Sequence, residues 1–192
     1  MPDGVRLEPA PSTTLLNVAN LISFGRLCAV PLAFWLVIDH ALGGAFILFV
    51  LAGASDAVDG WLARRAGGGN AIGAVLDPMA DKALLVTMYV TLAAIGAVPD
   101  WLAILVVFRD LIIVGGFMVL VLAGHSPAIR PLFVSKVNTT LQIILLGLTL
   151  FLAGFGVAAP GVAVVMNVLT WVVAATTLAS GGAYVWGALG AK

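Results

Sequence analysis

Four aspartates in this chain have the residue type and spacing most suited to chemistry. Asp56 and Asp59 stand three residues apart, and Asp77 and Asp81 stand four apart. Residues three or four apart share one face of a helix, so two adjacent helices could direct all four carboxylates to one point. Carboxylates so close repel one another unless some are protonated or divalent cations lie between them. Oxygen ligands alone suit Mg²⁺, Mn²⁺ or Ca²⁺, and two metals bridged by carboxylates suit displacement at phosphorus.

Each residue of this region also has a purely structural interpretation. Asp77 precedes Pro78 and could cap a helix, since proline is tolerated in a first helical turn. Gly60 could admit a ligand or only let helices pack closely. Arg64 could bind a phosphate or only anchor a helix at the cytoplasmic face. Four aspartates in register favour a functional site, because a carboxylate in or near a bilayer is costly unless it is paired or ligated.

The composition places these residues in a membrane protein. Of 192 residues, 62% are hydrophobic and 9% are charged, against about 45–50% and about 25% in soluble domains. The net charge of zero gives no sign of an acidic partner, and the single cysteine, Cys28, excludes an intrachain disulfide. Stretches of about twenty apolar residues cross a bilayer. Within a single domain, 1–192, six such stretches predict an all-α protein with transmembrane helices at 22–38, 41–62, 75–98, 101–123, 134–154 and 161–188.

The basic residues orient this predicted bundle. They occur in the N-terminal tail, at the end of the second span, around the connection after the fourth span and at the C-terminus: Arg6, Arg64, Arg65, Arg130, Lys136 and Lys192. Because cytoplasmic loops carry the excess of Lys and Arg, both termini and these two connections are expected on the cytoplasmic side. Residues 13–21 are expected to form a short helix lying at the interface. No transit peptide is visible, which favours a bacterial inner membrane.

The aspartate pattern resembles the signature of the CDP-alcohol phosphatidyltransferase family. The run Asp56-x2-Asp59-Gly60-x2-Ala63-Arg64-x8-Gly73-x3-Asp77-x3-Asp81 agrees with that signature at every fixed position and gap. The segment Asn20-x2-Ser23-x2-Arg26 is similar to the family's N-terminal segment, although Ala19 stands where many relatives have proline. The resemblance implies a six-helix membrane fold, a cytoplasm-facing site, two divalent cations (Mg²⁺ or Mn²⁺) and a homodimer.

The same resemblance implies a reaction and a role for each motif residue. A CDP-linked lipid would donate its phosphatidyl group to an alcohol, whose hydroxyl attacks the β-phosphorus, and CMP would leave. Asp56, Asp59 and Asp77 would bind one metal. Asp56, Asp77 and Asp81 would bind the second, and Asp81 would also be the general base. Contacts to the CDP-lipid would come from Asn20, Ser23, Gly60, Ala63, Arg64 and Asn70.

The downstream segments resemble those of CMP-forming cardiolipin synthases, which transfer phosphatidyl from CDP-diacylglycerol to phosphatidylglycerol. These segments are 76–82 (LDPMADK), Arg109-Asp110 and 131–139 (PLFVSKVNT). The resemblance implies that Arg109, Lys136 and Asn138 bind the acceptor. The alternative is phosphatidylglycerophosphate synthase, whose acceptor is glycerol 3-phosphate. Its relatives tend to carry Arg-Glu at the position of Arg109-Asp110, and Lys in place of Asn138.

Charge distinguishes the two candidate acceptors, and the chemistry of the motif argues against a transporter or a scaffold. Glycerol 3-phosphate has a charge of about −2 and needs several Arg or Lys. Phosphatidylglycerol has one negative charge, which suits the few basic residues near the predicted site and the neutral amide of Asn138. Arg109 and Asp110 could instead pair with other charged groups of the chain. A cation or solute transporter would need neither Arg64 nor this spacing, and a scaffold would have no use for Asp81 as a base.

Overall fold

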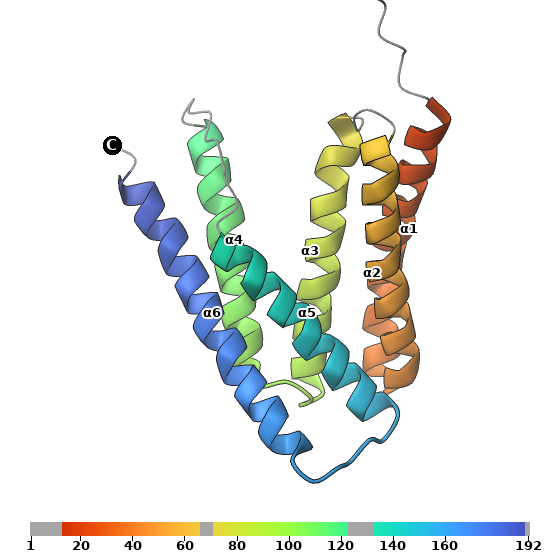
Figure 1. Cartoon of the computed structure of the whole chain (residues 1–192), viewed down its shortest axis with the longest axis vertical. Coiled ribbons are helices and arrows are strands. Elements are labelled where there is room, and N and C mark those ends of the chain that lie inside the picture. The colour runs from red at the N-terminus through yellow and green to blue at the C-terminus, as the bar shows by residue number, and fades with distance from the viewer. Residues whose placement is uncertain (1–12, 66–70, 123–132, 191–192) are drawn as a thin grey trace, which may run out of the picture.

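The residues that the structure describes form six α-helices that run alternately in opposite directions. The computed structural model describes the backbone of residues 13–65, 71–122 and 133–190, and the side chains of 24–55, 58, 82–116 and 133–187. Within these ranges there is no β-strand. In chain order (Figure 1) the helices are α1 (Thr13–Ile38), α2 (Leu42–Arg65), α3 (Ala71–Ala94), α4 (Asp100–Leu122), α5 (Phe133–Gly154) and α6 (Val162–Gly190).

The described connections form where the sequence supplies turn-forming residues. α1 ends before Asp39 and His40, and His40 adopts a left-handed backbone conformation with φ of 57°. α3 ends before Gly96, whose φ of 72° suits glycine because it has no Cβ. Both connections are short, so the helices that they join are antiparallel. Each of the six predicted apolar stretches is confirmed as a helix.

The prediction of a separate interfacial helix at residues 13–21 is wrong. Those residues form the first turns of α1, which continues without interruption to Ile38. Residues 13–24 contain neither glycine nor proline, so their sequence supplies no signal that would end a helix before the apolar stretch begins. Pro31 lies inside α1, where its missing N–H removes one internal hydrogen bond without ending the helix.

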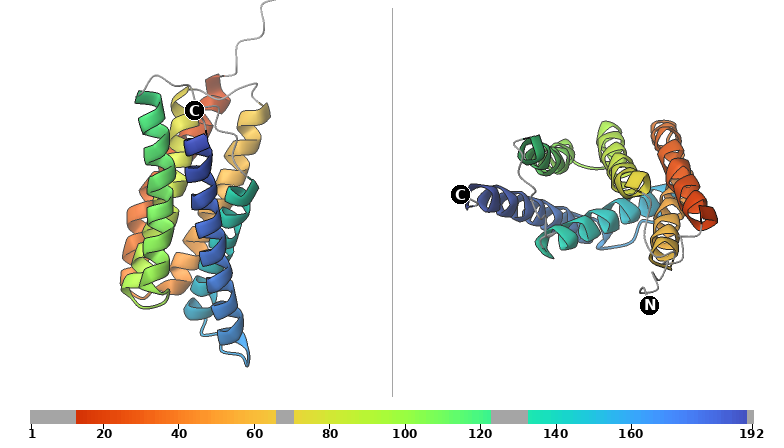
Figure 2. Two further views of the ribbon diagram at one scale, coloured as in Figure 1. Left: turned by 90° about the vertical axis from the view of Figure 1, so that its left-hand side faces the viewer. Right: turned by 90° about the horizontal axis from the view of Figure 1, so that it is seen from above.

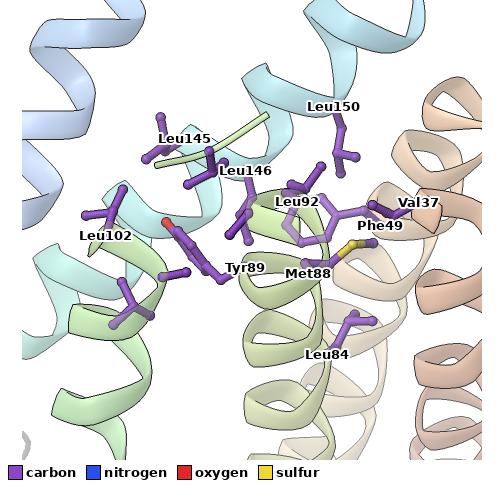
Figure 3. Packing of buried hydrophobic residues seen from close by; sticks show 14 of the residues in the cluster. Val37, Phe49, Leu84, Met88, Tyr89, Leu92, Leu102, Leu145, Leu146 and Leu150 are labelled. Atoms are coloured by element: carbon purple, nitrogen blue, oxygen red, sulfur yellow. The ribbon is translucent and has the colours of Figure 1, made fainter. Parts of the chain in front are cut away.

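The helices form two groups, one of α1, α2 and α3 and one of α4 and α6, and α5 lies between them. α1 packs against α2 and α3, and α4 packs against α3 and α6. α5 crosses obliquely between the groups and contacts α2, α3 and α6 (Figure 1, Figure 2). Fully buried side chains of α3 and α5 fill the centre (Figure 3): Met88, Tyr89, Leu92, Leu145, Leu146 and Leu150. The core therefore fixes α3 against the half of the bundle that contains α4, α5 and α6.

Glycine sets the distance between α5 and α2. A Cβ added to Gly154, the last residue of α5, would lie 2.5 Å from the backbone N of Gly43 and 2.7 Å from its Cα. Contacts that short do not occur, so the two backbones can meet only while residue 154 has no side chain. Aromatic rings close the same end of the bundle, with Phe46 centred 5.4 Å from Phe151 and 5.9 Å from Phe155.

The outer surface of the described helices is apolar. Trp35, Phe108 and Val164 are 67%, 61% and 65% exposed, and many other large hydrophobic side chains are exposed with them. A surface of this kind suits lipid and would be an aggregation hazard in water. By length and composition, two of the described helical stretches can cross a membrane, Phe133–Gly154 and Val162–Gly187. Phe24–Ile38, Leu42–Ser55 and Lys82–Ala94 are apolar but shorter within the described side chains.

Candidate active site

The four aspartates lie where α2 ends and α3 begins. α2 carries Asp56 and Asp59 in its last three turns, and α3 carries Asp77 and Asp81 in its first three turns. The backbone is helical at all four positions, so the predicted spacing keeps each pair on one helix face. The two helix ends lie at the same end of the bundle (Figure 1, Figure 2). Placement of the pairs on two helices is thereby confirmed, and their roles as ligands stay predictions.

Most of the predicted site lies outside the described side chains. Asn70 lies outside the described residues altogether. Only the backbone is described at Asn20, Ser23, Asp56, Asp59, Gly60, Ala63, Arg64, Asp77 and Asp81. Among the side chains that are described, no group of three or more His, Cys, Asp or Glu is arranged to hold a metal ion. As a donor set, four carboxylates match the oxygen ligands that Mg²⁺ and Mn²⁺ prefer, and they differ from the His and Cys typical of zinc sites.

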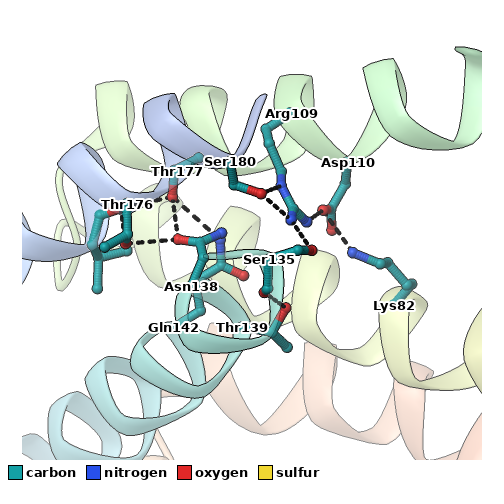
Figure 4. A network of polar contacts seen from close by, with 11 residues as sticks. Lys82, Arg109, Asp110, Ser135, Asn138, Thr139, Gln142, Thr176, Thr177 and Ser180 are labelled. Carbon is teal, nitrogen blue, oxygen red and sulfur yellow. Dashed lines mark hydrogen bonds and ion pairs between the residues drawn. The ribbon is translucent and has the colours of Figure 1, made fainter. Parts of the chain in front are cut away.

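A buried ionic cluster joins α3 to α4 one residue beyond Asp81. Lys82 places its Nζ 2.6 Å from Oδ1 of Asp110 (Figure 4). Arg109 donates from Nη1 to the same oxygen at 2.7 Å. Arg109 and Asp110 are only 3% and 6% exposed. Charges in such surroundings are tolerated when they are paired, which accounts for two ionisable residues inside the apolar α4.

The other nitrogens of Arg109 bind serines of α5 and α6. Nη2 donates to Ser180 Oγ at 2.6 Å and also to Ser135 Oγ, and Nε donates to Ser180 Oγ at 3.3 Å (Figure 4). Every nitrogen of the guanidinium therefore has a partner within the protein. These contacts favour the interpretation in which Arg109 pairs with groups of the chain itself. Its contact with an acceptor stays a prediction.

Asn138, also predicted to bind the acceptor, is completely buried between α5 and α6. As its amide is placed, Oδ1 lies 2.9 Å from Thr176 Oγ1 and 2.8 Å from Thr177 Oγ1 (Figure 4). The other polar atom of the amide, Nδ2, has no hydrogen-bond partner. One edge of the amide is thus bound to α6, and the opposite edge is unused.

The threonine hydroxyls connect Asn138 to the backbone of α6. Thr176 Oγ1 and Thr177 Oγ1 donate to Oδ1 of Asn138, and they also lie 3.0 Å and 2.7 Å from Val173 O. The unused edge of the amide is therefore its NH₂ group. That group can donate a hydrogen bond to a hydroxyl or phosphate oxygen of a ligand without adding a positive charge.

The third residue predicted to bind the acceptor, Lys136, is exposed on α5. The structure therefore buries Arg109 and Asn138 in the α4–α6 interior and leaves Lys136 at the surface. The polar residues of α6 that contact Arg109 and Asn138 were not among the site residues predicted from the sequence. Thr176 and Ser180 are four residues apart on one face of a largely apolar helix, and this spacing is the signal that could have found them.

A helical chain with an apolar exterior and polar contacts between its helices is typical of integral membrane proteins. Its place among such proteins follows from comparison with known sequences. The chain belongs to the CDP-alcohol phosphatidyltransferase family, because the sequence model of that family matches residues 16–179. The match includes all four aspartates and at least part of every helix.

Several characterised proteins resemble this chain along much of its length. A chloroplastic CDP-diacylglycerol–glycerol-3-phosphate 3-phosphatidyltransferase 1 of Oryza sativa subsp. japonica is 36% identical over 86% of the chain and 55% of its own length. A cardiolipin synthase (CMP-forming) of Homo sapiens is 30% identical over 94% of the chain and 66% of its own length. A cardiolipin synthase (CMP-forming) of Streptomyces coelicolor is 31% identical over 66% of the chain and 63% of its own length. The chain thus spans between 55% and 66% of these relatives.

Proposed function

We propose that this protein is a CMP-forming cardiolipin synthase, which transfers a phosphatidyl group from CDP-diacylglycerol to phosphatidylglycerol. Membership of the family supports a CDP-linked lipid as donor. The relatives from human and Streptomyces coelicolor bear the name of this activity. The observation that carries the choice of acceptor is the pairing of Lys82 and Arg109 with Asp110.

That pairing leaves little positive charge for a doubly charged acceptor. Glycerol 3-phosphate has a charge of about −2 at neutral pH, and its binding calls for several Arg or Lys with free donors. Arg109 has all of its nitrogens engaged by the protein, and Lys82 binds the same carboxylate. Of the three residues predicted to bind the acceptor, Lys136 alone is an exposed cation. One cation matches the single negative charge of phosphatidylglycerol.

Asn138 supports the same acceptor. Its oxygen accepts hydrogen bonds from Thr176 and Thr177, and its NH₂ group is unused. That group would donate a hydrogen bond to a glycerol hydroxyl or a phosphate oxygen of phosphatidylglycerol. Because the amide is neutral, it adds no positive charge, which suits an acceptor with a single negative charge.

In the proposed reaction, Asp81 accepts the proton of the acceptor hydroxyl while its oxygen attacks the β-phosphorus of the donor. The bond from the β-phosphorus to the CMP oxygen breaks, and CMP leaves with that electron pair. Asp56, Asp59, Asp77 and Asp81 would hold two divalent cations, Mg²⁺ or Mn²⁺, which when bound neutralise the diphosphate. The CDP-lipid would be held by Asn20, Ser23, Gly60, Ala63, Arg64 and Asn70.

We also propose that the six helices span a bacterial inner membrane, with both termini and the aspartates on the cytoplasmic side. The start of α1 and the end of α6 lie at the same end of the bundle as the aspartate-bearing turns (Figure 1). Arg64 and Arg65 close α2 at that end, which supports a cytoplasmic location. The relative from Streptomyces coelicolor supports a bacterial setting. A homodimer is proposed from the family resemblance.

Phosphatidylglycerophosphate synthase is the second candidate. The rice relative favours it, since that protein bears the name of this activity and is 36% identical to the chain. This candidate would use the same donor and the same carboxylates, with glycerol 3-phosphate as acceptor. The two candidates therefore differ only in the alcohol.

The experiment that tests the proposal is release of CMP by the purified protein. CDP-diacylglycerol and Mg²⁺ or Mn²⁺ are supplied with phosphatidylglycerol or with glycerol 3-phosphate. We expect release of CMP with phosphatidylglycerol, cardiolipin as the lipid product, and loss of activity in EDTA. Release with glycerol 3-phosphate only would establish the second candidate. No release with either alcohol would contradict both.

A further inference from the structure

We propose that Asp110 is a positioning residue that, through Lys82, fixes the rotation of α3 and thereby the placement of Asp77 and Asp81. The inference rests on the proposed function, which gives those two aspartates their role at the metal site. Asp110 itself has no place in that site. Its contribution is to connect the first turns of α3 to the rest of the bundle.

The contacts around Asp110 link four helices in one chain of short polar interactions. Oδ1 of Asp110 on α4 lies 2.6 Å from Lys82 Nζ on α3 and 2.7 Å from Arg109 Nη1. Arg109 then donates to Ser180 on α6 and Ser135 on α5 (Figure 4). The position of Lys82 is therefore set by three helices at once.

Burial makes this chain of contacts stiff. Arg109 and Asp110 are almost fully buried, and separating a buried pair exposes each charge to an apolar environment at a high cost in free energy. Arg109 cannot turn away without also leaving Ser135 and Ser180. Lys82 is the less buried member, with 36% of its side chain exposed. Asp110 is thus the fixed point, and Lys82 is the residue that it holds.

The helix geometry carries this restraint to the predicted site. Successive residues of an α-helix are about 100° apart around its axis, so a contact that fixes Lys82 also fixes position 81 beside it. Tyr89, seven residues further on and on the same face, donates from its hydroxyl to Gln142 O on α5 at 3.2 Å. Two contacts on one face, two turns apart, prevent α3 from rotating about its axis. Asp77 lies one turn before Asp81 in the same helix, so the position of Asp77 is fixed together with that of Asp81.

Four variants and one control test the inference. Lys82→Met and Asp110→Asn each remove the ion pair, the double variant removes both partners, and Lys82→Arg preserves the pair. Thr91→Val is the control, because Thr91 lies in the same helix and bonds only to carbonyls of that helix, Thr87 O and Met88 O. Each purified variant is titrated with Mn²⁺ by electron paramagnetic resonance, and CMP release gives kcat and KM for the donor.

We expect Lys82→Met and Asp110→Asn each to weaken Mn²⁺ binding about tenfold or more, as loss of a group that orients metal ligands does. The kcat of both variants should fall together with their affinity for Mn²⁺. The double variant should be no worse than Asp110→Asn alone, because Asp110→Asn already removes the contact with Lys82 in addition to the contact with Arg109. Lys82→Arg should restore most of the Mn²⁺ affinity, and Thr91→Val should behave as the wild type.

Two results would overturn the inference. One is unchanged Mn²⁺ affinity in Asp110→Asn, and the other is a double variant whose loss is the product of the two single losses. If Asp110→Asn does not fold, Lys82→Met against Lys82→Arg decides, and equal Mn²⁺ binding in these two contradicts the inference. A wild type that neither binds Mn²⁺ nor releases CMP contradicts the proposed function itself. A wild type that does both, with variants that match it, contradicts only the positioning role.

Discussion

Two buried polar side chains between α4, α5 and α6, Arg109 and Asn138, are each held by more than one neighbour. Arg109 bonds to Asp110, Ser135 and Ser180, and the amide of Asn138 contacts two threonine hydroxyls. In an apolar interior such groups are stable only when paired. An atom left unused there, such as the free edge of Asn138, is a place where a ligand group can bind.

Asp81→Asn is expected to abolish turnover while metal-dependent binding of CDP-diacylglycerol is largely retained. An amide can still offer an oxygen to a cation, but it cannot take a proton from the acceptor hydroxyl. CMP release measures the first property, and Mn²⁺-dependent retention of labelled CDP-diacylglycerol measures the second. Turnover at the wild-type rate in this variant would rule out Asp81 as the base.

Asn138→Leu, which preserves side-chain volume, is expected to raise KM for phosphatidylglycerol about tenfold, as loss of a buried hydrogen bond to a ligand does. KM for CDP-diacylglycerol should not change. Thr176 and Thr177 retain their carbonyl partners in this variant, so its effect on folding should be small. Initial rates with each substrate varied in turn provide both constants. Equal changes in the two KM values would remove Asn138 from the acceptor site.

The sequence was sufficient to predict the aspartate pairs but not the polar partners of Arg109. Asp56 with Asp59 and Asp77 with Asp81 are neighbours along one helix, so their spacing is enough to place each pair on one face. Ser135 and Ser180 meet Arg109 only because α4, α5 and α6 pack together. Contacts between residues far apart in the chain depend on that packing, which no local pattern contains.

For the helices, the turn-forming residues between them predicted the boundaries better than the positions of charged residues did. Clusters of Gly, Pro, Asn and Asp correctly separated the six helices. The first span was predicted to begin at residue 22, whereas α1 begins at Thr13, because residues 13–21 continue the same helix. Arg26 lies inside α1, where it is 3% exposed. A charged residue can therefore lie within a membrane helix once neighbouring helices cover it.

Gly154→Ala is expected to destabilise the protein by about 1–3 kcal/mol, because the added methyl group would overlap the backbone of Gly43. Gly147→Ala is the matched control in the same helix. A Cβ at Gly147 would meet only Phe49, at an ordinary 3.8 Å, and alanine favours the helix. Thermal unfolding in one detergent compares the two variants. Equal midpoints would show that α5 and α2 do not depend on this close contact.

At the scale of the whole molecule, the described ends of α1 and α6 share one end of the bundle with the aspartates. The membrane orientation that we propose can be read with single cysteines in a Cys28→Ala background. In a bacterial inner membrane, His40→Cys and Ala158→Cys should react with an impermeant maleimide from outside. Phe133→Cys, 79% exposed in the native chain, should react only after permeabilisation. The reverse pattern would invert the proposed orientation.

A competition between the two alcohols shows which acceptor the protein uses. Purified protein receives CDP-diacylglycerol, Mg²⁺ and equal concentrations of phosphatidylglycerol and glycerol 3-phosphate, and mass spectrometry measures both lipid products. Because Lys82 and Arg109 are paired with Asp110, we expect cardiolipin to form in large excess over phosphatidylglycerophosphate. An excess of phosphatidylglycerophosphate would contradict it.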